Sequence, residues 1–315
     1  MKVLFIDEVH SILETRLTKM GFKCELNFDL NRQEILSRIG EYQGLVIRSK
    51  TPIDFEFLNA AKKLRFIARS GSGLENIDLL EAKKRHIHLF SAPEGNRQAV
   101  GEHALGMILS LFNKICHGNK EIREGKWNRE DNKGVELSGK IIGIIGYGNM
   151  GKSFAKCLSG FNCRVLAYDK YKKNISDEYV IESSLEYIQE NAEIISFHTP
   201  YDKSTHHLLN EKFVKNMRKK FYLINTSRGK VVNTNAILTG LRTGKILGAC
   251  LDVLEFEKTN FEKIFDQKIP IVFKKLLEST NVILTPHVAG WTEESYKKLS
   301  LVLAKKIEDK FGFQI

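Results

Sequence analysis

The chain has 315 residues, of which 42% are hydrophobic and 28% are charged. This length suits two domains of roughly 150 residues each, and the composition excludes a disordered or fibrous protein. Lys and Arg exceed Asp and Glu by 49 to 38, a net charge of +11 that is compatible with a nucleic acid, an anionic membrane or a small anion. The basic residues form no tail or stripe, so we expect no nucleic-acid partner.

The amino terminus and the cysteines together indicate a cytoplasmic protein. Met1–Asp7 has the pattern of a strand, and its apolar run is too short for a signal peptide or a membrane span. The five cysteines are odd in number and form no C-x-x-C pair. We therefore expect free thiols in the core and a reducing cytoplasm, without disulfides, bound metal or membrane contact.

The first third of the chain alternates short β-rich runs with amphipathic helical stretches. Ile12, Leu13, Leu17 and Met20, for example, form one helical stripe between the first two runs. Such alternation predicts a parallel sheet that is covered by helices on both faces. The predicted strands of this part are Val3–Ile6, Cys24–Phe28, Gly44–Ile47, Phe66–Ala68 and His88–Phe90.

A long helical stretch follows from about Gln98 to Glu124, with apolar residues at helical spacing. A helix of about 27 residues would span roughly 40 Å, which is more than a simple crossover between strands needs. The sequence therefore predicts a helix that bridges two domains or builds a dimer interface. We expect a homodimer that forms through this helix.

A second series of strands begins after this helix and predicts a second doubly wound unit. Pro93, Pro200 and Pro286 each close a predicted strand, because proline ends the hydrogen-bonded ladder and fixes the exit of the chain. The expected fold class is therefore α/β, with two doubly wound parallel-sheet domains. The predicted strands of the second series are Ile141–Ile145, Arg164–Tyr168, Ile194–His198, Tyr222–Asn225, Gly248–Val253 and Val282–Leu284.

The first strand of the second series runs into a G-x-G-x-x-G motif, Gly146–Gly151, which opens the next helix. Gly146 allows the tight turn, Gly148 lets a pyrophosphate approach the backbone, and Gly151 lets the helix pack closely on the strand. Glycines in a turn can also be purely structural. The complete strand–turn–helix context nevertheless favours a dinucleotide-binding site.

Asp169 ends the following strand and indicates which dinucleotide binds. A carboxylate at this place accepts hydrogen bonds from the adenosine ribose and repels a 2′-phosphate, which favours NAD over NADP. Lys170, Lys172 and Lys173 follow directly and could hold a 2′-phosphate. A solvated charge run is the simpler interpretation of these lysines, so we expect NAD.

Polar side chains follow three later strands, at the edge where ligands bind in open α/β sheets. Arg228 follows one strand, the next strand ends in the acids Asp252, Glu255 and Glu257, and His287 follows the last. Arginine is the natural bidentate partner of a carboxylate. Imidazole can take the hydroxyl proton when an alcohol gives up a hydride, and a nearby carboxylate would orient the ring and stabilise its protonated form.

With these motifs the chain resembles the D-isomer-specific 2-hydroxyacid dehydrogenase family along essentially its whole length. The matching blocks are Gly146–Gly151, His198–Pro200, Ile224–Gly229, Leu251–Val253 with Glu257, and Pro286-His287 with Ala289-Gly290. The resemblance implies that Arg228 binds the substrate carboxylate and C2 oxygen, that His287 exchanges the hydroxyl proton, and that Glu257 pairs with His287. It also implies an NAD site that is lined by Gly146, Gly148, Asn149, Met150, Gly151, Asp169, His198, Thr199, Pro200, Thr205, Thr226, Ser227, Asp252 and Gly290.

The order of the predicted elements, together with the resemblance, indicates how the chain divides into domains. We expect a flavodoxin-like, substrate-binding domain from residues 1–97 together with 288–315. Residues 98–287 would form a Rossmann NAD-binding domain, with Asp252 beside the nicotinamide.

Two departures from the family pattern are visible after Glu257. The family usually has proline next, whereas this chain has Lys258, and the stretch up to His287 is unusual in placing Phe261, Ile264, Phe265 and Ile269 among charged residues. Glu255 and Glu262 are nearby acids. The assignment of the catalytic carboxylate to Glu257 therefore rests on its offset from Asp252.

Within the family, the amino-terminal part is most similar to D-3-phosphoglycerate dehydrogenase. The similar blocks are Val46–Thr51, Ala68–Asp78, Pro93–Asn96 and Gly125–Trp127. The resemblance implies that Arg48 and Arg69 bind the substrate phosphate, because a phosphate needs cationic partners. We also expect the backbone amides of the loop Ser70, Gly71, Ser72 and Gly73 to bind the substrate carboxylate together with Arg228. Surface arginines that bond only to nearby backbone are the alternative.

The expected reaction is oxidation of D-3-phosphoglycerate to 3-phosphohydroxypyruvate by NAD, the first step of serine biosynthesis. Because the chain ends at Ile315, we expect a short form without a regulatory domain. Two alternatives stay open: a glyoxylate/hydroxypyruvate or D-lactate type of dehydrogenase, and a non-enzymatic NAD-sensing binding protein of the same fold.

Overall fold

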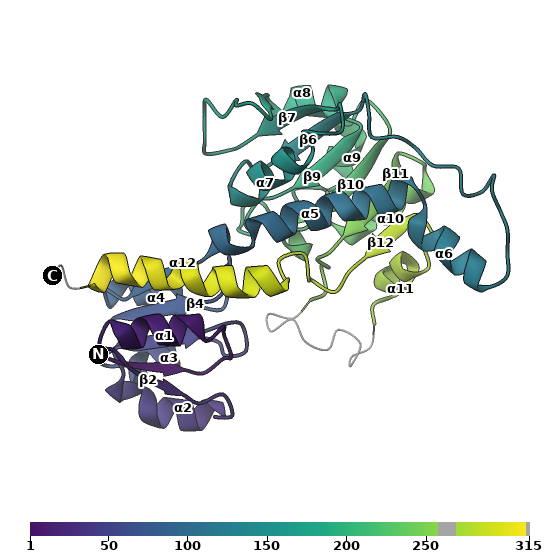
Figure 1. The fold of residues 1–315 in the computed structure, drawn as a ribbon. Coiled ribbons are helices and arrows are strands. Elements are labelled where there is room, and N and C mark those ends of the chain that lie inside the picture. The colour runs from purple at the N-terminus through teal and green to yellow at the C-terminus, as the bar shows by residue number, and fades with distance from the viewer. Residues whose placement is uncertain (258–268, 313–315) are drawn as a thin grey trace. The chain divides into compact units, whose positions relative to one another are not determined.

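The computed structural model describes residues 1–257 and 269–312, and Figure 1 shows its ribbon. The chain folds into two units that each have their own hydrophobic core. Among the described residues, 1–97 and 291–312 form the first unit, and 98–257 and 269–290 form the second. Lys258, Phe261, Glu262, Ile264 and Phe265, part of the unusual stretch in the sequence, lie outside the described residues.

The first unit is built on a five-stranded parallel sheet with the strand order β2-β1-β3-β4-β5. This is the flavodoxin-like order, in which the chain reverses its direction of winding between β1 and β3. It confirms the predicted fold of this part. The strands are β1 (Lys2–Phe5), β2 (Lys23–Leu26), β3 (Gly44–Ile47), β4 (Phe66–Arg69) and β5 (His88–Ser91).

Helices cover both faces of this sheet because alternate residues of each strand point to opposite faces. Val3 and Phe5 of β1 pack with α1 and α12, whereas Leu4 packs with α2, α3 and α4 on the other face. In Figure 1 the carboxy-terminal helix α12 (yellow) lies beside α1 (purple), although they are far apart in the sequence. The helices are α1 (Ile12–Lys19), α2 (Arg32–Arg38), the 3-10 turn η1 (Ile39–Glu41), α3 (Phe55–Ala60), α4 (Leu79–Lys84) and α12 (Glu293–Phe311).

The second unit is built on a seven-stranded parallel sheet with the order β12-β11-β10-β9-β6-β7-β8. The strand order reverses between β6 and β9, as in a Rossmann fold, and this confirms the second predicted domain type. The sequence did not predict the two-residue β8. The strands are β6 (Ile141–Ile145), β7 (Arg164–Tyr168), β8 (Ile181–Glu182), β9 (Ile194–Phe197), β10 (Phe221–Asn225), β11 (Ile246–Leu251) and β12 (Val282–Leu284).

Two cores lie on the two faces of the seven-stranded sheet. One contains α5 and α7 with Ile142 and Ile144 of β6, and the other contains α8, α9, α10 and α11 with Ile145. Ile269, at the edge of the described residues, packs against the second of these cores. The elements are α7 (Asn149–Cys157), α8 (Leu185–Asn191), α9 (Glu211–Asn216), the 3-10 turn η2 (Gly229–Val231), α10 (Thr234–Arg242) and α11 (Ile271–Leu277).

The prediction of one helix from Gln98 to Glu124 was wrong. The structure has α5 (Pro93–Phe112) and α6 (Ile115–Arg123), separated by Lys114 in the left-handed region at φ 50°. The side chain of Asn113 donates a hydrogen bond to the carbonyl of Leu109, and this bond helps to end α5. No helix among the described residues is long and apolar enough to cross a membrane.

The cysteines are free thiols, but they do not all lie in the core. Cys250 on β11 is buried, and burial raises the pKa of its thiol. Cys116 on α6 is exposed, which contradicts the expectation that the thiols lie in the core.

Candidate active site

The predicted cofactor and catalytic residues of the second unit follow the carboxyl ends of its strands. Gly146 follows β6, Asp169 follows β7, and His198 follows β9. On the other side of the reversal, the turn with Arg228 follows β10, and Asp252 follows β11. Parallel strands bring all of these ends to one edge of the sheet, where ligands of this fold bind.

The glycines of the fingerprint are required by the geometry of the turn. Gly146 has φ 96°, and a Cβ there would lie 2.8 Å from the carbonyl carbon and oxygen of His198. A Cβ on Gly151 would overlap the carbonyl oxygen of Gly146. A Cβ on Gly148 would meet no atom within 4 Å, so the backbone faces open space there. This pattern fits the close approach of a pyrophosphate.

Helix α7 begins directly at this turn without a side-chain cap. Its N-cap is Gly148, so no side chain satisfies the N–H groups of the first turn, to which Asn149 and Met150 belong. These N–H groups have no acceptor within the helix, and the helix dipole favours negative charge near them. The start of α7 therefore fits an anionic phosphate group.

Asp169 uses its carboxylate to shape the adjacent loop. Oδ2 accepts the N–H of Tyr147 at 2.9 Å, and Oδ1 accepts the N–H groups of Tyr171 and Lys172 at 3.0 Å. A carboxylate has about four acceptor positions, so one is left for a ribose hydroxyl. The Nζ of Lys172 donates to the carbonyl of Tyr147 at 3.4 Å, which gives this lysine a structural contact.

Two buried hydroxyls at the same edge have no hydrogen-bond partner among the described residues. They belong to Thr199 and Thr226, both predicted to line the cofactor. A buried polar atom without a partner costs free energy, and a bound ligand with hydrogen-bonding groups removes that cost. The two hydroxyls therefore fit a dinucleotide at this edge.

Two other predicted hydroxyls are engaged within the protein. Ser227 Oγ donates to Asn225 Oδ1 at 2.8 Å, and Thr205 Oγ1 donates to the carbonyl of Pro200 at 2.8 Å. Thr205 Oγ1 also accepts the N–H of Asp202 at 2.8 Å. These bonds fix the turns after β9 and β10.

The side chain of His198 lies in the core. Its Nε2 is 2.8 Å from Ser196 Oγ, and its ring packs against Phe154 with the centroids 5.4 Å apart. Burial lowers the pKa of His198 to about 3, so the ring is neutral at ordinary pH. The part of His198 that meets the fingerprint turn is its backbone, next to Gly146.

The side chains of His287 and Glu257 are in direct contact. His287 Nδ1 lies 2.7 Å from Glu257 Oε2, and the side chains are 23% and 12% exposed. The other oxygen of Glu257 accepts the N–H of Leu254. A carboxylate on Nδ1 fixes the orientation of the imidazole and stabilises its protonated form.

Asp252 holds the loop that carries His287. Its Oδ1 accepts the Thr285 hydroxyl at 2.6 Å and the Val288 N–H at 2.9 Å, and its Oδ2 accepts the Ala289 N–H at 2.9 Å. The Asp252 carbonyl accepts the N–H of His287, whose φ of 56° is in the left-handed region. Asp252 thus stabilises the strained backbone that aims the imidazole. Gly290 stands at the end of the same loop, three positions after His287 in the sequence.

His103 on α5 joins this network and was not identified from the sequence. Its Nε2 is 3.1 Å from Thr285 Oγ1 and 3.5 Å from Asp252 Oδ1. His103 lies within the predicted long helix, away from the ends of the predicted strands, so no feature of the sequence indicated that it belongs to the site. Only the packing of α5 against the sheet brings it to the carboxyl edge.

The turn with Arg228 packs against the loop that carries Glu257. Arg228 Nη1 donates to the carbonyl of Ser227 at 2.6 Å, and its own carbonyl accepts Asn225 Nδ2 at 3.0 Å. A Cβ on Gly229 would overlap the carbonyl of Leu254, so glycine is needed for this contact. Arg228, Glu257 and His287 thus belong to one unit and to adjacent strand ends.

Glu255, the competing acid, has different partners. It lies 2.7 Å from His207 Nε2 and accepts the N–H and hydroxyl of Thr234 at 2.8 and 2.7 Å. Burial alone would raise the pKa of Glu255, but the hydrogen bonds from Thr234 and the nearby His207 outweigh it and lower the pKa. The geometry therefore gives Glu257 as the partner of His287. Glu262 lies outside the described residues.

The predicted substrate residues of the first unit follow β3 and β4. Arg69 is buried, donates from Nε to the carbonyl of Arg48 at 3.2 Å, and lies so close over Gly71 that a Cβ there would overlap it. Ser72 Oγ donates to Asn96 Oδ1 at 2.7 Å. The buried Ser70 hydroxyl has no partner among the described residues. Gly73 completes this loop.

Comparison with known families decides the class. Residues 105–289, more than half of the chain, match the model described as "D-isomer specific 2-hydroxyacid dehydrogenase, NAD binding domain". The chain belongs to this 2-hydroxyacid dehydrogenase family. The family and the NAD cofactor predicted from the motifs are thereby confirmed.

The curated relatives of this chain are named after several different substrates. A D-3-phosphoglycerate dehydrogenase of Archaeoglobus fulgidus is 31% identical over 98% of this chain and 56% of its own length. A hydroxypyruvate reductase of Thermotoga maritima is 33% identical over 90% of this chain and 89% of its own. A glyoxylate reductase of Thermofilum pendens is 35% identical over 88% of this chain and 80% of its own length. The chain spans about half the length of the phosphoglycerate dehydrogenases it matches.

Solved structures of dehydrogenases and reductases have the same fold. A D-lactate dehydrogenase of Aquifex aeolicus complexed with NAD and lactic acid is 26% identical and has a TM-score of 0.82, covering 98% of this chain and 95% of that one. An acyclic imino acid reductase in complex with NADPH and D-Arg is 25% identical with a TM-score of 0.85, covering 98% and 97%.

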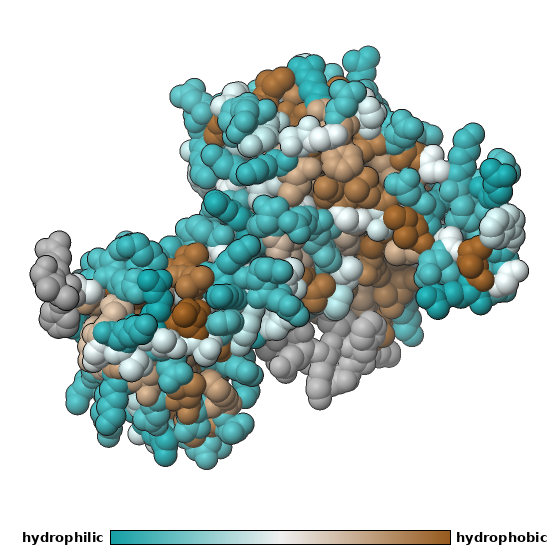
Figure 2. All heavy atoms as spheres, in the orientation of Figure 1, coloured by the Kyte–Doolittle hydropathy of each residue, from teal (hydrophilic) through white to brown (hydrophobic). Residues whose placement is uncertain are grey.

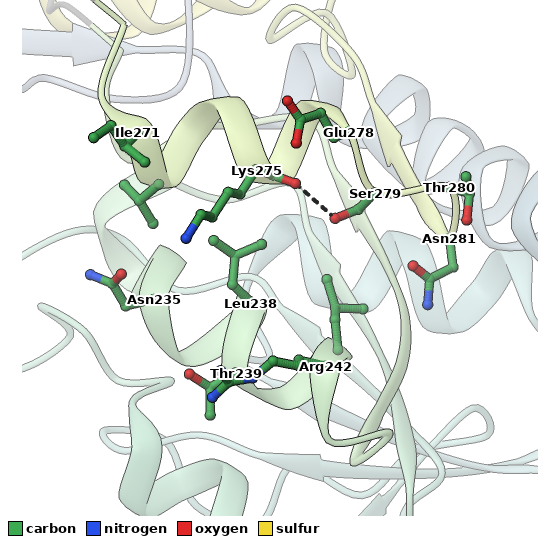
Figure 3. Close-up of a pocket in the computed structure, with 12 residues that line it drawn as sticks. Asn235, Leu238, Thr239, Arg242, Ile271, Lys275, Glu278, Ser279, Thr280 and Asn281 are labelled. Carbon is green, nitrogen blue, oxygen red and sulfur yellow. Dashed lines mark hydrogen bonds between the residues drawn. The ribbon is translucent and has the colours of Figure 1, made fainter.

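A surface hollow of this dehydrogenase family member lies between α10 and α11, and none of the predicted site residues lines it. Figure 3 shows Leu238 of α10 opposite Lys275 of α11, with Ile271 at the start of α11 and Arg242 at the end of α10. Ser279 Oγ closes the end of α11 by donating to the Lys275 carbonyl at 3.0 Å. The hollow is therefore a feature separate from the predicted active site.

Proposed function

We propose that the protein is an NAD-dependent D-2-hydroxyacid dehydrogenase that oxidises D-3-phosphoglycerate to 3-phosphohydroxypyruvate. The observation that carries the reaction class is the His287–Glu257 pair at 2.7 Å, next to the Arg228 turn, in a unit that matches the NAD binding domain of the family. The product would feed serine biosynthesis.

Three residues of the chain have separate roles in this reaction. The guanidinium of Arg228 binds the substrate carboxylate and the C2 oxygen, because its planar fork matches a pair of oxygens. His287 takes the hydroxyl proton while the C2–H bond breaks and the C2=O bond forms. Glu257 stabilises the imidazolium that results. NAD, when bound, supplies the acceptor for the hydride from C2.

The cofactor would be held by the edge of the seven-stranded sheet. We assign the pyrophosphate to the Gly146–Gly151 turn and the start of α7, and the adenosine ribose to Asp169. The unpartnered hydroxyls of Thr199 and Thr226 support this assignment. The other residues that we propose to line the cofactor are His198, Pro200, Thr205, Ser227, Asp252 and Gly290.

The substrate phosphate is assigned to Arg48 and Arg69, and its carboxylate also to the N–H groups of Ser70–Gly73. Arg48 directly follows β3 and Arg69 ends the adjacent strand β4, and the buried Ser70 hydroxyl lacks a partner among the described residues. The relatives named D-3-phosphoglycerate dehydrogenase, similar to this chain over 98% of its residues, support this substrate.

The test compares initial rates with D-3-phosphoglycerate, D-glycerate and D-lactate at saturating NAD. We expect the highest kcat/KM for the phosphorylated acid. Equal or better turnover of the unphosphorylated acids would contradict the phosphate assignment. In the same assay His287→Gln should reduce kcat by about 10²- to 10⁴-fold, since a general base is lost, while NADH still binds with unchanged affinity. A variant that keeps most of its activity would contradict the role of His287.

One observation favours the first of two alternatives, and another argues against the second. The hydroxypyruvate reductase of Thermotoga maritima matches this chain over 89% of its own length, which favours a reductase of an unphosphorylated acid. A non-enzymatic NAD-sensing protein would show no turnover with any acid, and the paired His287 and Glu257 argue against it. The rate comparison separates all three.

We also propose that the protein is a homodimer in which α6 contributes to the interface. Ile115 and Ile122 lie seven residues apart on one face of α6, and each is 55% exposed. Figure 2 shows apolar surface (brown) among hydrophilic side chains over this helix. Exposed apolar side chains of this kind are typical of a surface that another chain covers.

A further inference from the structure

The side chain of Arg48, at the end of β3, is stacked on an aromatic ring. Its Cζ lies 3.8 Å from the centroid of the Trp291 ring and 5.9 Å from that of Tyr296. All three residues belong to the first unit, where Trp291 comes just before α12 and Tyr296 lies in its first turns. No motif in the sequence connects positions 48 and 291.

The guanidinium of Arg48 has no hydrogen bond or ion pair to any residue that the structure describes. Its backbone is engaged instead: the N–H donates to Asp7 Oδ2 at 2.5 Å, and the carbonyl accepts Arg69 Nε at 3.2 Å. Asp7 and Glu8 are near enough to favour the charged form, yet burial outweighs them and lowers the pKa of Arg48. A half-buried cation whose donors are unsatisfied is costly unless a ligand completes it.

Stacking determines which part of the guanidinium a ligand can reach. The aromatic ring occupies one face of the planar group through a cation–π contact. The five N–H donors lie in the plane, at the edge, and are left for an oxyanion. An arginine that is already held by a ring has less rotamer freedom to lose when it binds two phosphate oxygens. An arginine whose side chain is free in solvent loses more.

We propose that Trp291 is a positioning residue that holds Arg48 ready for the phosphate of the substrate, and that it thereby sets the preference for phosphorylated over unphosphorylated 2-hydroxy acids. The inference rests on the proposed function, because it takes the substrate to be a 2-hydroxy acid. Trp291 itself touches the arginine and does not take part in the chemistry at His287.

Kinetics of Trp291→Ala and Trp291→Phe test this role. In Trp291→Ala we expect the KM for D-3-phosphoglycerate to rise about tenfold, in line with a partly desolvated cation–π contact, while kcat stays within about twofold. The KM for D-glycerate should not change, because this acid has no phosphate. Trp291→Phe keeps an aromatic face and should restore most of the affinity.

Phe55→Ala is the matched control. Phe55 is also an exposed ring of the first unit near an arginine, with Arg85 Cζ 5.9 Å from its centroid. Unlike Arg48, Arg85 already donates side-chain hydrogen bonds, from Nε to Glu81 at 2.7 Å and from Nη1 to the Leu58 carbonyl at 3.0 Å. Loss of the Phe55 ring should therefore leave the KM values for D-3-phosphoglycerate and D-glycerate unchanged.

A second measurement does not depend on turnover. Inorganic phosphate titrated into the wild type should change the tryptophan emission, and the change should be absent in Trp291→Phe, which retains Trp127. A change that persists in Trp291→Phe would contradict the inference.

The outcomes of the kinetics separate the two proposals. A wild type without preference for D-3-phosphoglycerate contradicts the proposed function. A wild-type preference that survives Trp291→Ala contradicts only the inference, as does an equal rise in both KM values, which would indicate a general structural role.

Discussion

Three histidines at the carboxyl edge of the seven-stranded sheet differ in their partners, and the partners decide what each can do. His287 and His207 each face a carboxylate at 2.7 Å, that of Glu257 and that of Glu255. Among the described residues, His198 has only the Ser196 hydroxyl as a side-chain hydrogen-bond partner, and it is buried. A histidine beside a carboxylate can hold a proton, whereas a buried one without a counter-charge stays neutral. Proton exchange is thus open to His287 and closed to His198.

The neutral His198 predicts a particular loss of stability in acid. Burial lowers the pKa of His198 to about 3, whereas the unfolded chain has a value of about 6.5. Below about pH 6.5 the unfolded chain therefore binds a proton that the folded chain does not, and the free energy of unfolding falls as the pH drops toward 3. At pH 5 this one group should cost up to about 2 kcal/mol relative to pH 7.5.

Urea unfolding of the wild type and of His198→Asn at pH 7.5 and pH 5 measures this cost. Other groups titrate in both proteins, so the relevant quantity is the difference between their losses on acidification. We expect the smaller loss in His198→Asn. Equal losses in the two proteins would show that His198 does not resist protonation in the fold.

At this scale the sequence predicts residue types better than contacts. His287 could be singled out because a polar residue after a parallel strand lies at the ligand-binding edge. The offset from Asp252 selected Glu257 over Glu255, but the direction in which each side chain turns after β11, and thus its histidine partner, is visible only in the structure. The Arg48–Trp291 contact could not be predicted, since it joins distant parts of the chain that carry no shared motif.

At the scale of elements, the β6–turn–α7 unit is the part that local rules predict most completely. Gly151→Ala tests it, because a Cβ there would overlap the Gly146 carbonyl and push α7 from the turn. We expect at least about tenfold weaker NADH binding, measured by fluorescence titration, and about 1–3 kcal/mol lower stability from overpacking.

Gly160→Ala is the control for this substitution. A Cβ on Gly160, beyond the end of α7, would meet no atom within 4 Å. It should bind NADH as the wild type does. Normal affinity in Gly151→Ala would mean that the close contact between helix and turn is not needed for the dinucleotide.

The elements that were predicted wrongly depend on side-chain bonds or on neighbouring strands. The apolar pattern runs from α5 into α6 without interruption, and the break comes from Lys114 in the left-handed region with Asn113 bonded back to Leu109. The short β8 exists because it pairs with β7, and two residues alone carry no periodicity.

At the scale of the whole molecule, the net charge of +11 is a weaker guide than the placement of a few residues. Arg48 and Arg69 end neighbouring strands of one sheet, and Arg228 follows a strand of the other. The topology of parallel sheets, which gathers strand ends at one edge, selects these three from a large number of basic residues. The proposal of an anionic substrate therefore rests on the position of these arginines and not on the total charge.

The proposed dimer gives the prediction for the assembled molecule. Ile122→Asp would place a charge in an apolar contact, where desolvation of the carboxylate opposes association. Light scattering after size exclusion should show a dimer for the wild type and a monomer for Ile122→Asp. Leu80→Asp is the control: Leu80 is 76% exposed, but it lies on α4 of the first unit, so the dimer should persist. A monomeric wild type, or a dimer that survives Ile122→Asp, would contradict the assignment of the interface to α6.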